Sequence, residues 1–173
     1  MVLGIPDCKA RLLPYDPQWA LEARRTIEAL RKLLGDLAAD FQHVGSTSVP
    51  GLTAKPVIDI AVGVSSLESV VEREALLREN GFHYRPWTRK ETELLLACRD
   101  EEREMDTHYI HVVLYGCPQW RHYIRFRDAL RSSEALRLEY EELKIGLART
   151  MGEDRVKYTA GKAEFIGRVL KDG

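Results

Sequence analysis

The alternation of apolar and polar residues is most regular in residues 56–64, PVIDIAVGV, and it predicts a β-strand. One face of this strand is entirely apolar, whereas the other is small and carries a single acid. The two faces consist of Ile58, Ile60, Val62 and Val64, and of Val57, Asp59, Ala61 and Gly63. Because burying a lone carboxylate is unfavourable, Asp59 must meet water, a partner or a cation.

Helical spacing of apolar residues is strongest in residues 15–35 and predicts an amphipathic helix. Asp16 can cap this helix, Pro17 suits its first position, and Gly35 stands where a helix stops. The apolar face comprises Ala20, Ala23, Ile27, Leu30 and Leu34.

The other predicted elements follow in an order that mixes helices with strands. A helix over 65–81 has capping-box spacing between Ser65 and Glu68, and Gly81 ends it. Strands are expected over 9–14, 41–44, 82–87, 91–98 and 107–115, with an exposed hairpin tip at 99–106, and helices over 118–133, 134–152 and 154–173. This order favours an α+β fold: a mostly antiparallel sheet packed by helices, followed by a C-terminal helical bundle. We expect residues 1–116 to form the α/β core and residues 117–173 to form a helical part of the same domain.

Composition and charge narrow the class of protein. The 173 residues are 45% hydrophobic and 31% charged, with a net charge of −1, so no global electrostatic attraction to nucleic acid or to an anionic membrane is expected. No apolar run approaches the ~20 residues of a membrane span. Three scattered cysteines and an N-terminus without a long apolar core favour a cytoplasmic protein. The sequence leaves open whether the protein forms a homo-oligomer.

The loop before the central strand has the composition of an anion-binding turn. Gly45 lets backbone N–H groups approach a ligand, and the hydroxyls of Ser46, Thr47 and Ser48 add donors. Lys55 adds a positive charge, and Asp59 could hold Mg²⁺, which typically bridges a carboxylate and phosphate oxygens. The alternative is a plain connecting loop, followed by an aspartate that pairs with a lysine or arginine.

The stretch HVGSTSVPGLTAKPVIDI, residues 43–60, resembles the signature of the GrpB family of small bacterial proteins. Later segments match in the same order: IHVV, FRDALR, EYEELKIGLA and YTAGKAEFI. The resemblance implies a nucleotidyltransferase-like fold. In that superfamily, a Gly-Ser pair and carboxylates on neighbouring strands hold a nucleotide triphosphate and two divalent ions. By position, Gly45 and Ser46 form that pair, and Asp59 is the first carboxylate.

The sequence departs from this superfamily pattern at Ala61, where a second carboxylate is expected. Two-metal chemistry depends on several negative ligands, whereas one carboxylate can hold a single Mg²⁺ whose shell is completed by water and phosphate. Glu93 and Asp106 are candidates for a third carboxylate.

Two histidines are candidates for proton transfer or anion binding. His43 ends the strand that enters the loop, so it could lie close to Asp59, and His111 lies in the strand over 107–115. His108 is three residues from His111, so a strand sends the two side chains to opposite faces. The alternative for His43 and His111 is a structural histidine that bonds to the backbone.

Two functions are compatible with these features. The first is a pocket that binds a nucleotide or another phosphorylated small molecule with Mg²⁺, for nucleotidyl or phosphoryl transfer with Asp59, His43 and His111 as catalytic residues. The second is a non-catalytic ligand-binding, accessory or chaperone-like module. Ala61 favours the second function, and the polar loop favours at least binding.

Overall fold

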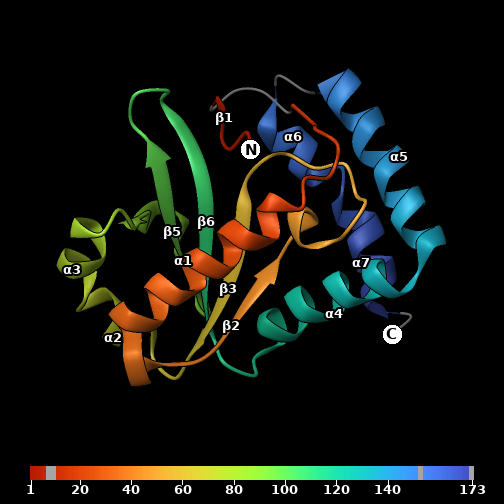
Figure 1. Ribbon diagram of the computed structural model, residues 1–173. Coiled ribbons are helices and arrows are strands. Elements are labelled where there is room, and N and C mark those ends of the chain that lie inside the picture. Colours follow the sequence, from red (N-terminus) through yellow and green to blue (C-terminus); the bar gives the residue numbers. More distant parts are fainter. Residues whose placement is uncertain (7–10, 152–153, 172–173) are drawn as a thin grey trace.

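A six-stranded mixed sheet lies at the centre of the protein in the computed structural model, which describes residues 1–6, 11–151 and 154–171 (Figure 1). The strand order is β2-β3-β6-β5-β4, and β1 pairs with the start of β6. Only β3 and β6 are parallel among the described pairs. The strands are β1 (Ile5–Pro6), β2 (Ala38–Val44), β3 (Ile58–Val64), β4 (His83–Tyr84), β5 (Glu93–Asp100) and β6 (Met105–Leu114). This arrangement confirms the predicted α+β fold with a mostly antiparallel sheet.

The helices fall into two groups along the chain: those that precede the last strand, β6, and those that follow it. Helix α1 (Gln18–Leu34) begins one residue after Pro17, the predicted first helical position, although Asp16 Oδ1 accepts the expected capping hydrogen bond, from the Gln18 N–H at 2.9 Å. The helix ends at Gly35, whose φ is +54°. The others are α2 (Leu67–Val71), α3 (Glu74–Glu79), α4 (Pro118–Ser132), α5 (Glu134–Met151), α6 (Arg155–Ala160) and α7 (Ala163–Lys171), with short 3₁₀ turns η1 (Gly35–Leu37), η2 (Ser46–Ser48) and η3 (Pro86–Thr88). None of the helices that the structure describes is both long and apolar enough to span a membrane.

The sheet has two differently packed faces, because α1 covers one and the C-terminal helices cover part of the other (Figure 1). Ile58, Ile60 and Val62 are fully buried in the core that includes Trp19 and Leu30 of α1. On the opposite face, Ala61 and Val113 pack against Trp120 of α4. The predicted division of the central strand into a core face and a small face is therefore confirmed.

The predicted helix over 65–81 is wrong in its continuity and in its cap. Ser66, rather than Ser65, adopts an extended conformation and accepts a hydrogen bond from the Ser69 N–H, so α2 begins at Leu67. Glu68 forms an ion pair with Arg89 instead of closing a capping box. The chain then leaves helical geometry before α3.

Three other predicted elements differ in extent from the sequence pattern. The last predicted helix, 154–173, is divided into α6 and α7 at Gly161, and a Cβ atom there would lie 2.5 Å from Leu147 Cδ2 of α5. Of the strand predicted over 9–14, residues 9–10 lie outside the described residues, and Leu13 forms one isolated bridge with Ala54. The 82–87 strand reduces to β4, after which Pro86 begins η3.

The loop between β2 and β3 is anchored in the helical third of the chain. Val49 and Leu52 are completely buried in one apolar cluster with Leu130, Tyr140 and Phe165. Side chains of α4, α5 and α7 therefore hold the turn that precedes Asp59.

Candidate functional site

A cleft lies between the small face of the sheet and the C-terminal helices. It consists of two adjoining hollows of about 330 and 480 Å³, a size suited to a small-molecule ligand. Residues from β3, β6, α4 and α7 line both hollows, together with the start of η2. The shared residues are Ser46, Asp59, His111, Gln119, Tyr123, Lys162 and Ile166.

The turn after β2 packs directly against Asp59. Gly45 has φ +68° and ψ −175°, a conformation that is almost restricted to glycine. A Cβ atom at Gly45 would lie only 2.4 Å from Asp59 Oδ2. The Gly-Ser turn and the carboxylate therefore converge on one cleft, as the sequence predicts.

The hydroxyl groups of the turn differ in their roles. Ser46 lines both hollows. Thr47 lines one hollow, but its hydroxyl donates to the Val57 carbonyl at 3.2 Å. Ser48 is buried, and its hydroxyl donates to the Gly45 carbonyl at 2.6 Å. Ser46 is therefore the hydroxyl best placed for a ligand, whereas Thr47 and Ser48 mainly hold the turn in shape.

His43 belongs to the opposite face of the sheet from Asp59. It pairs in register with Ile60, and paired residues share a face. Its Nε2 lies 3.1 Å from Thr47 Oγ1, and burial lowers its pKa to about 4 although Asp59 acts in the other direction. His43 is absent from the lining of both hollows, so it supports the turn through Thr47 rather than facing the cleft.

His111 lies at the centre of a hydrogen-bonded network on the cleft side. Its Nε2 is 3.4 Å from Asp59 Oδ1, and its Nδ1 is 2.9 Å from Glu93 Oε1. The Tyr123 hydroxyl donates to the same Glu93 oxygen at 2.6 Å, and Lys90 Nζ donates to Glu93 Oε2 at 2.9 Å. The network joins β3, β6 and β5 to α4, although these residues are far apart in the sequence.

The charges in this network reinforce one another. Burial acts against the charge of His111, but the hydrogen bonds and charges of Asp59 and Glu93 outweigh it and raise the pKa of His111 to about 9. Burial likewise acts against the Glu93 carboxylate, but His111, Tyr123 and Lys90 lower the pKa of Glu93 to about 2. Burial and the Glu93 charge raise the pKa of the Tyr123 hydroxyl. At neutral pH the network therefore holds an imidazolium between two carboxylates.

Three lysines line the larger hollow of the cleft. Lys55 and Lys162 lie over the Tyr158 ring, with their Nζ atoms 3.8 and 4.9 Å from its centre. Lys144 is only 2% exposed, donates to the Thr53 carbonyl, and has its pKa lowered to about 7 by burial. Lys55 was predicted from the loop, whereas Lys144 was not. The available signal was its position four residues after Tyr140, on the buried face of a helix.

The cleft does not fit the two-ion site of the superfamily. Ala61 is completely buried in the cluster with Val113 and Trp120, so a carboxylate at that position would be covered by α4. Glu93 is already bonded to His111, Tyr123 and Lys90. Within the described residues, no group of three His, Cys, Asp or Glu side chains could hold a metal ion.

Asp106, the other candidate for a third carboxylate, lies away from the cleft lining. Its Oδ1 is 3.1 Å from Arg85 and 3.4 Å from Arg99, and its Oδ2 accepts a hydrogen bond from the Tyr109 hydroxyl. These contacts assign Asp106 a structural role at the start of β6.

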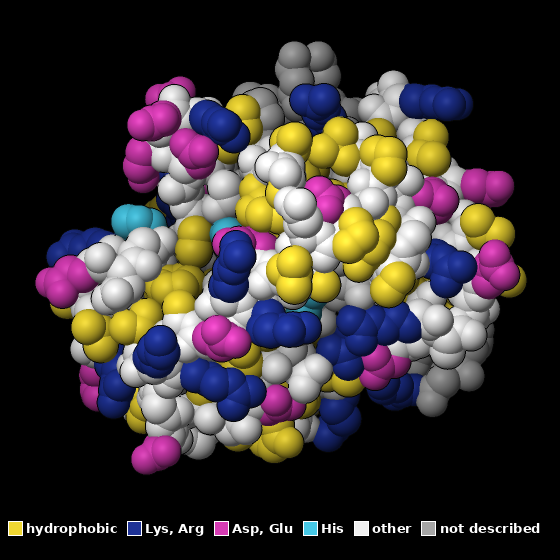
Figure 2. Space-filling model, viewed as in Figure 1, with side chains coloured by type: hydrophobic (Ala, Val, Ile, Leu, Met, Phe, Trp, Pro, Cys, Tyr) yellow, Lys and Arg dark blue, Asp and Glu magenta, His cyan; other side chains and the backbone are white. Residues whose placement is uncertain are grey.

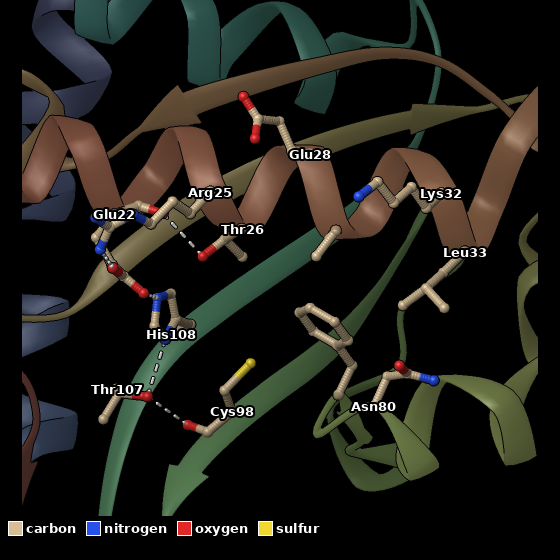
Figure 3. Close-up of a pocket in the computed structure, with 12 residues that line it drawn as sticks. Glu22, Arg25, Thr26, Glu28, Lys32, Leu33, Asn80, Cys98, Thr107 and His108 are labelled. Atoms are coloured by element: carbon tan, nitrogen blue, oxygen red, sulfur yellow. Dashed lines mark hydrogen bonds and ion pairs between the residues drawn. The ribbon is translucent and has the colours of Figure 1, made fainter.

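A separate hollow of about 510 Å³ lies on the other face of the sheet, between α1 and strands β5 and β6 (Figure 3). His108 faces it, with Nδ1 2.9 Å from Thr107 Oγ1 and Nε2 3.7 Å from Glu22 Oε1. His108 and His111 therefore point to opposite faces, as predicted. Lys and Arg side chains are interspersed with acids on this side of the molecule (Figure 2). The hollow is larger than either part of the cleft but has neither the glycine turn nor Asp59, so we place the candidate site in the cleft.

The fold is nucleotidyltransferase-like, as a comparison with a solved structure shows. A solved structure of the Cid1 poly(U) polymerase with Mg 3′-dATP bound superposes with a TM-score of 0.54, covering 91% of this chain and 49% of that one. The two sequences are 16% identical, so the likeness concerns the fold alone.

The chain belongs to the GrpB family, because the model of the family described as GrpB protein matches residues 9–172. The glutamate-rich protein GrpB of Alkalihalophilus pseudofirmus is 32% identical over 173 residues, with 99% of each chain covered. The crystal structure of the conserved protein GrpB from Enterococcus faecalis superposes with a TM-score of 0.85 at 28% identity, covering 94% of this chain and 96% of that one. The family expected from residues 43–60 is thereby confirmed.

Proposed function

We propose that this protein binds a nucleotide or another phosphorylated small molecule in the cleft between the sheet and the C-terminal helices. The observation that carries the proposal is the convergence of Lys55, Lys144 and Lys162 on one hollow that also contains Ser46. Lysine ammonium groups are common phosphate ligands, and charge-assisted hydrogen bonds are stronger than neutral ones. Gly45 adds a backbone that a ligand can approach closely.

The buried position of Lys144 favours a ligand role over a purely structural one. A lysine almost free of solvent contact is costly unless it is paired, and methionine would fill the same space without a charge. Burial lowers the pKa of Lys144 and so opposes its charged form, and keeping such a group at the wall of a cleft is typical of sites where function and stability are in conflict.

The binding test is calorimetry with ATP, GTP, CTP, coenzyme A and inorganic pyrophosphate, each with Mg²⁺ and with EDTA. Lys55→Met and Lys162→Met are each expected to weaken binding about tenfold, because each removes one charge-assisted contact of roughly 1.5 kcal/mol. Lys157→Met is the matched control, since Lys157 lies on α6, lines neither hollow and pairs with Asp154 at 3.0 Å. Failure of every probe to bind the wild-type protein would refute the proposal.

A second prediction distinguishes a ligand-binding role of Lys144 from a purely structural role. Burial lowers its pKa from 10.5 to about 7, so the folded state disfavours the charged form. The cost is greatest below pH 7 and fades as pH rises towards 10.5, where the unfolded chain also loses the proton. Lys144→Met is therefore expected to raise the free energy of unfolding at pH 6 by about 1 kcal/mol while weakening pyrophosphate binding.

Urea denaturation at pH 6 and pH 10, together with calorimetry on the same variant, measures both effects. The stability gain should be smaller at pH 10. A variant that loses stability at pH 6 would show that the Lys144 contact with Thr53 holds the fold together, and the lysine would then need no ligand to explain it.

Metal-assisted nucleotidyl or phosphoryl transfer is the second candidate function, favoured by the packing of Gly45 against Asp59. Asp59 would hold one Mg²⁺ weakly, with water and ligand oxygens completing its shell. Asp59→Ala would then remove Mg²⁺-dependent binding, whereas binding that is the same in EDTA would leave the non-catalytic ligand-binding function.

A further inference from the structure

The side chain of His111 is held from one side by residues of β5 and α4. Glu93 Oε1 lies 2.9 Å from His111 Nδ1, and the Tyr123 hydroxyl lies 2.6 Å from that oxygen and 3.0 Å from Nδ1. The Tyr123 ring is 4.9 Å from the imidazole, centre to centre. We call Glu93 and Tyr123 the His111 clamp.

The clamp fixes which nitrogen faces the cleft. A carboxylate oxygen only accepts hydrogen bonds, so Nδ1 must carry the hydrogen that points at Glu93. The ring is then oriented with Nε2 towards Asp59 Oδ1, at 3.4 Å, on the side that both hollows share. Lys90 binds the other oxygen of Glu93 at 2.9 Å and so limits rotation of the carboxylate.

The strand register explains why this histidine has room beside Asp59. His111 pairs with Ala61 across β3 and β6, and Asp59 pairs with Tyr109 two residues earlier on the same face. Because the Ala61 side chain is only a methyl group, the His111 imidazole is the polar side chain that lies next to Asp59. A group fixed in this way is pre-organised for a ligand, since little rotamer freedom is lost on binding.

We infer that Glu93 and Tyr123 are positioning residues that hold His111 with Nε2 towards the cleft, where it contacts a phosphate oxygen of the ligand beside Asp59. The inference rests on the proposed phosphate-binding function and adds a recognition element from β6 to the lysines of the larger hollow. It also assigns Glu93 to the histidine and not to a metal ion.

The test compares Tyr123→Phe with Tyr115→Phe, because each change removes one tyrosine hydroxyl near α4, but Tyr115 lines neither hollow and its ring lies 5.3 Å from that of Trp120, whereas Tyr123 contacts His111. Binding of inorganic pyrophosphate is measured by calorimetry, and the ring nitrogens of His111 are followed by ¹⁵N NMR. Tyr123→Phe is expected to weaken binding about fivefold and to shift the Nδ1 resonance. Tyr115→Phe should change neither quantity.

Two replacements of Glu93 separate positioning from a bulk charge effect. Glu93→Gln keeps an oxygen that can accept from Nδ1, whereas Glu93→Leu removes it. Positioning predicts a loss of at most about threefold for Glu93→Gln and of more than tenfold for Glu93→Leu, with folding checked by circular dichroism. Equal losses for the two variants would contradict the inference that Glu93 positions His111.

The outcomes distinguish this inference from the proposed function on which it rests. If the wild-type protein binds pyrophosphate and neither Tyr123→Phe nor Glu93→Leu weakens binding, the inference is wrong and the proposed function stands. If no probe binds the wild-type protein, the proposed function and the His111–phosphate contact both fail. The His111 ring signals then still report whether Glu93 and Tyr123 orient the ring.

Discussion

Replacing Gly45 with alanine is expected to destabilise the protein by about 3 kcal/mol, as measured by urea denaturation. Gly45 combines φ +68° with ψ −175°, a region of backbone conformation that other residues essentially do not occupy. The added methyl group would also lie 2.4 Å from Asp59 Oδ2 and 2.9 Å from Asp59 Cβ, both well inside van der Waals contact. Strain and overlap act at the same residue, so the turn must move or Asp59 must leave its position.

Gly51→Ala is the matched control for this experiment. Gly51 lies in the same loop with φ +78°, but no atom lies within 4 Å of a Cβ built there. Its replacement should cost about 1 kcal/mol from conformation alone. Asp59→Ala should leave the fold intact and should recover part of the loss when combined with Gly45→Ala. Equal costs for the two glycine replacements would mean that the contact with Asp59 is unimportant.

The second large effect is expected from Glu93→Leu, which should lower the free energy of unfolding by about 3 kcal/mol at pH 6. Removing one partner of a buried ion pair leaves the other charge uncompensated. Glu93 is 4% exposed, and its loss leaves the His111 imidazolium without the carboxylate at Nδ1. Glu91→Leu, two residues earlier at an exposed position, is the control and should change stability little.

The pH dependence of wild-type stability follows from the same pair. The pKa of His111 is raised from 6.5 to about 9, so its contribution is fully present below pH 6.5 and is lost as pH rises through 9. The pKa of Glu93 is lowered from 4.5 to about 2, so its contribution is present above pH 4.5 and is lost as pH falls through 2. The pair therefore stabilises the fold most between about pH 4.5 and 6.5.

Urea denaturation of the wild-type and Glu93→Leu proteins from pH 3 to pH 10 tests this dependence. The difference between the two proteins should be largest near pH 6 and should shrink towards pH 10, where His111 becomes neutral. A difference that stays constant across this range would indicate lost packing in place of a lost ion pair.

Sequence patterns with short periods predicted the framework of this protein well. Alternation in residues 56–64 identified the two faces of β3, because strand geometry fixes the direction of every second side chain. Asp16 and Gly35 marked the ends of α1, since both act on the backbone within one turn. The convergence of Gly45 with Asp59 was also predictable, because β2 and β3 are neighbouring antiparallel strands.

The parts that sequence reasoning missed depend on contacts between distant residues. Lys144 contacts Thr53 across 91 positions, and Tyr123 contacts Glu93 across 30. His43 lies on the face of the sheet opposite the cleft, because it pairs with Ile60 and its neighbour Val44 pairs with Asp59. The sequence alone does not reveal this pairing. The helix expected over 65–81 is interrupted at Arg73, where φ −94° and ψ 10° depart from helical geometry between α2 and α3.

The burial of Val49 and Leu52 among the C-terminal helices constrains how this family can diversify. The C-terminal helices that contribute Lys144 and Lys162 to the cleft also pack against Val49 and Leu52, which follow the glycine turn. A lineage that reshaped these helices to accept a new molecule would disturb the turn at the same time. Changes in ligand preference and changes in the rigidity of the turn should therefore be inherited together.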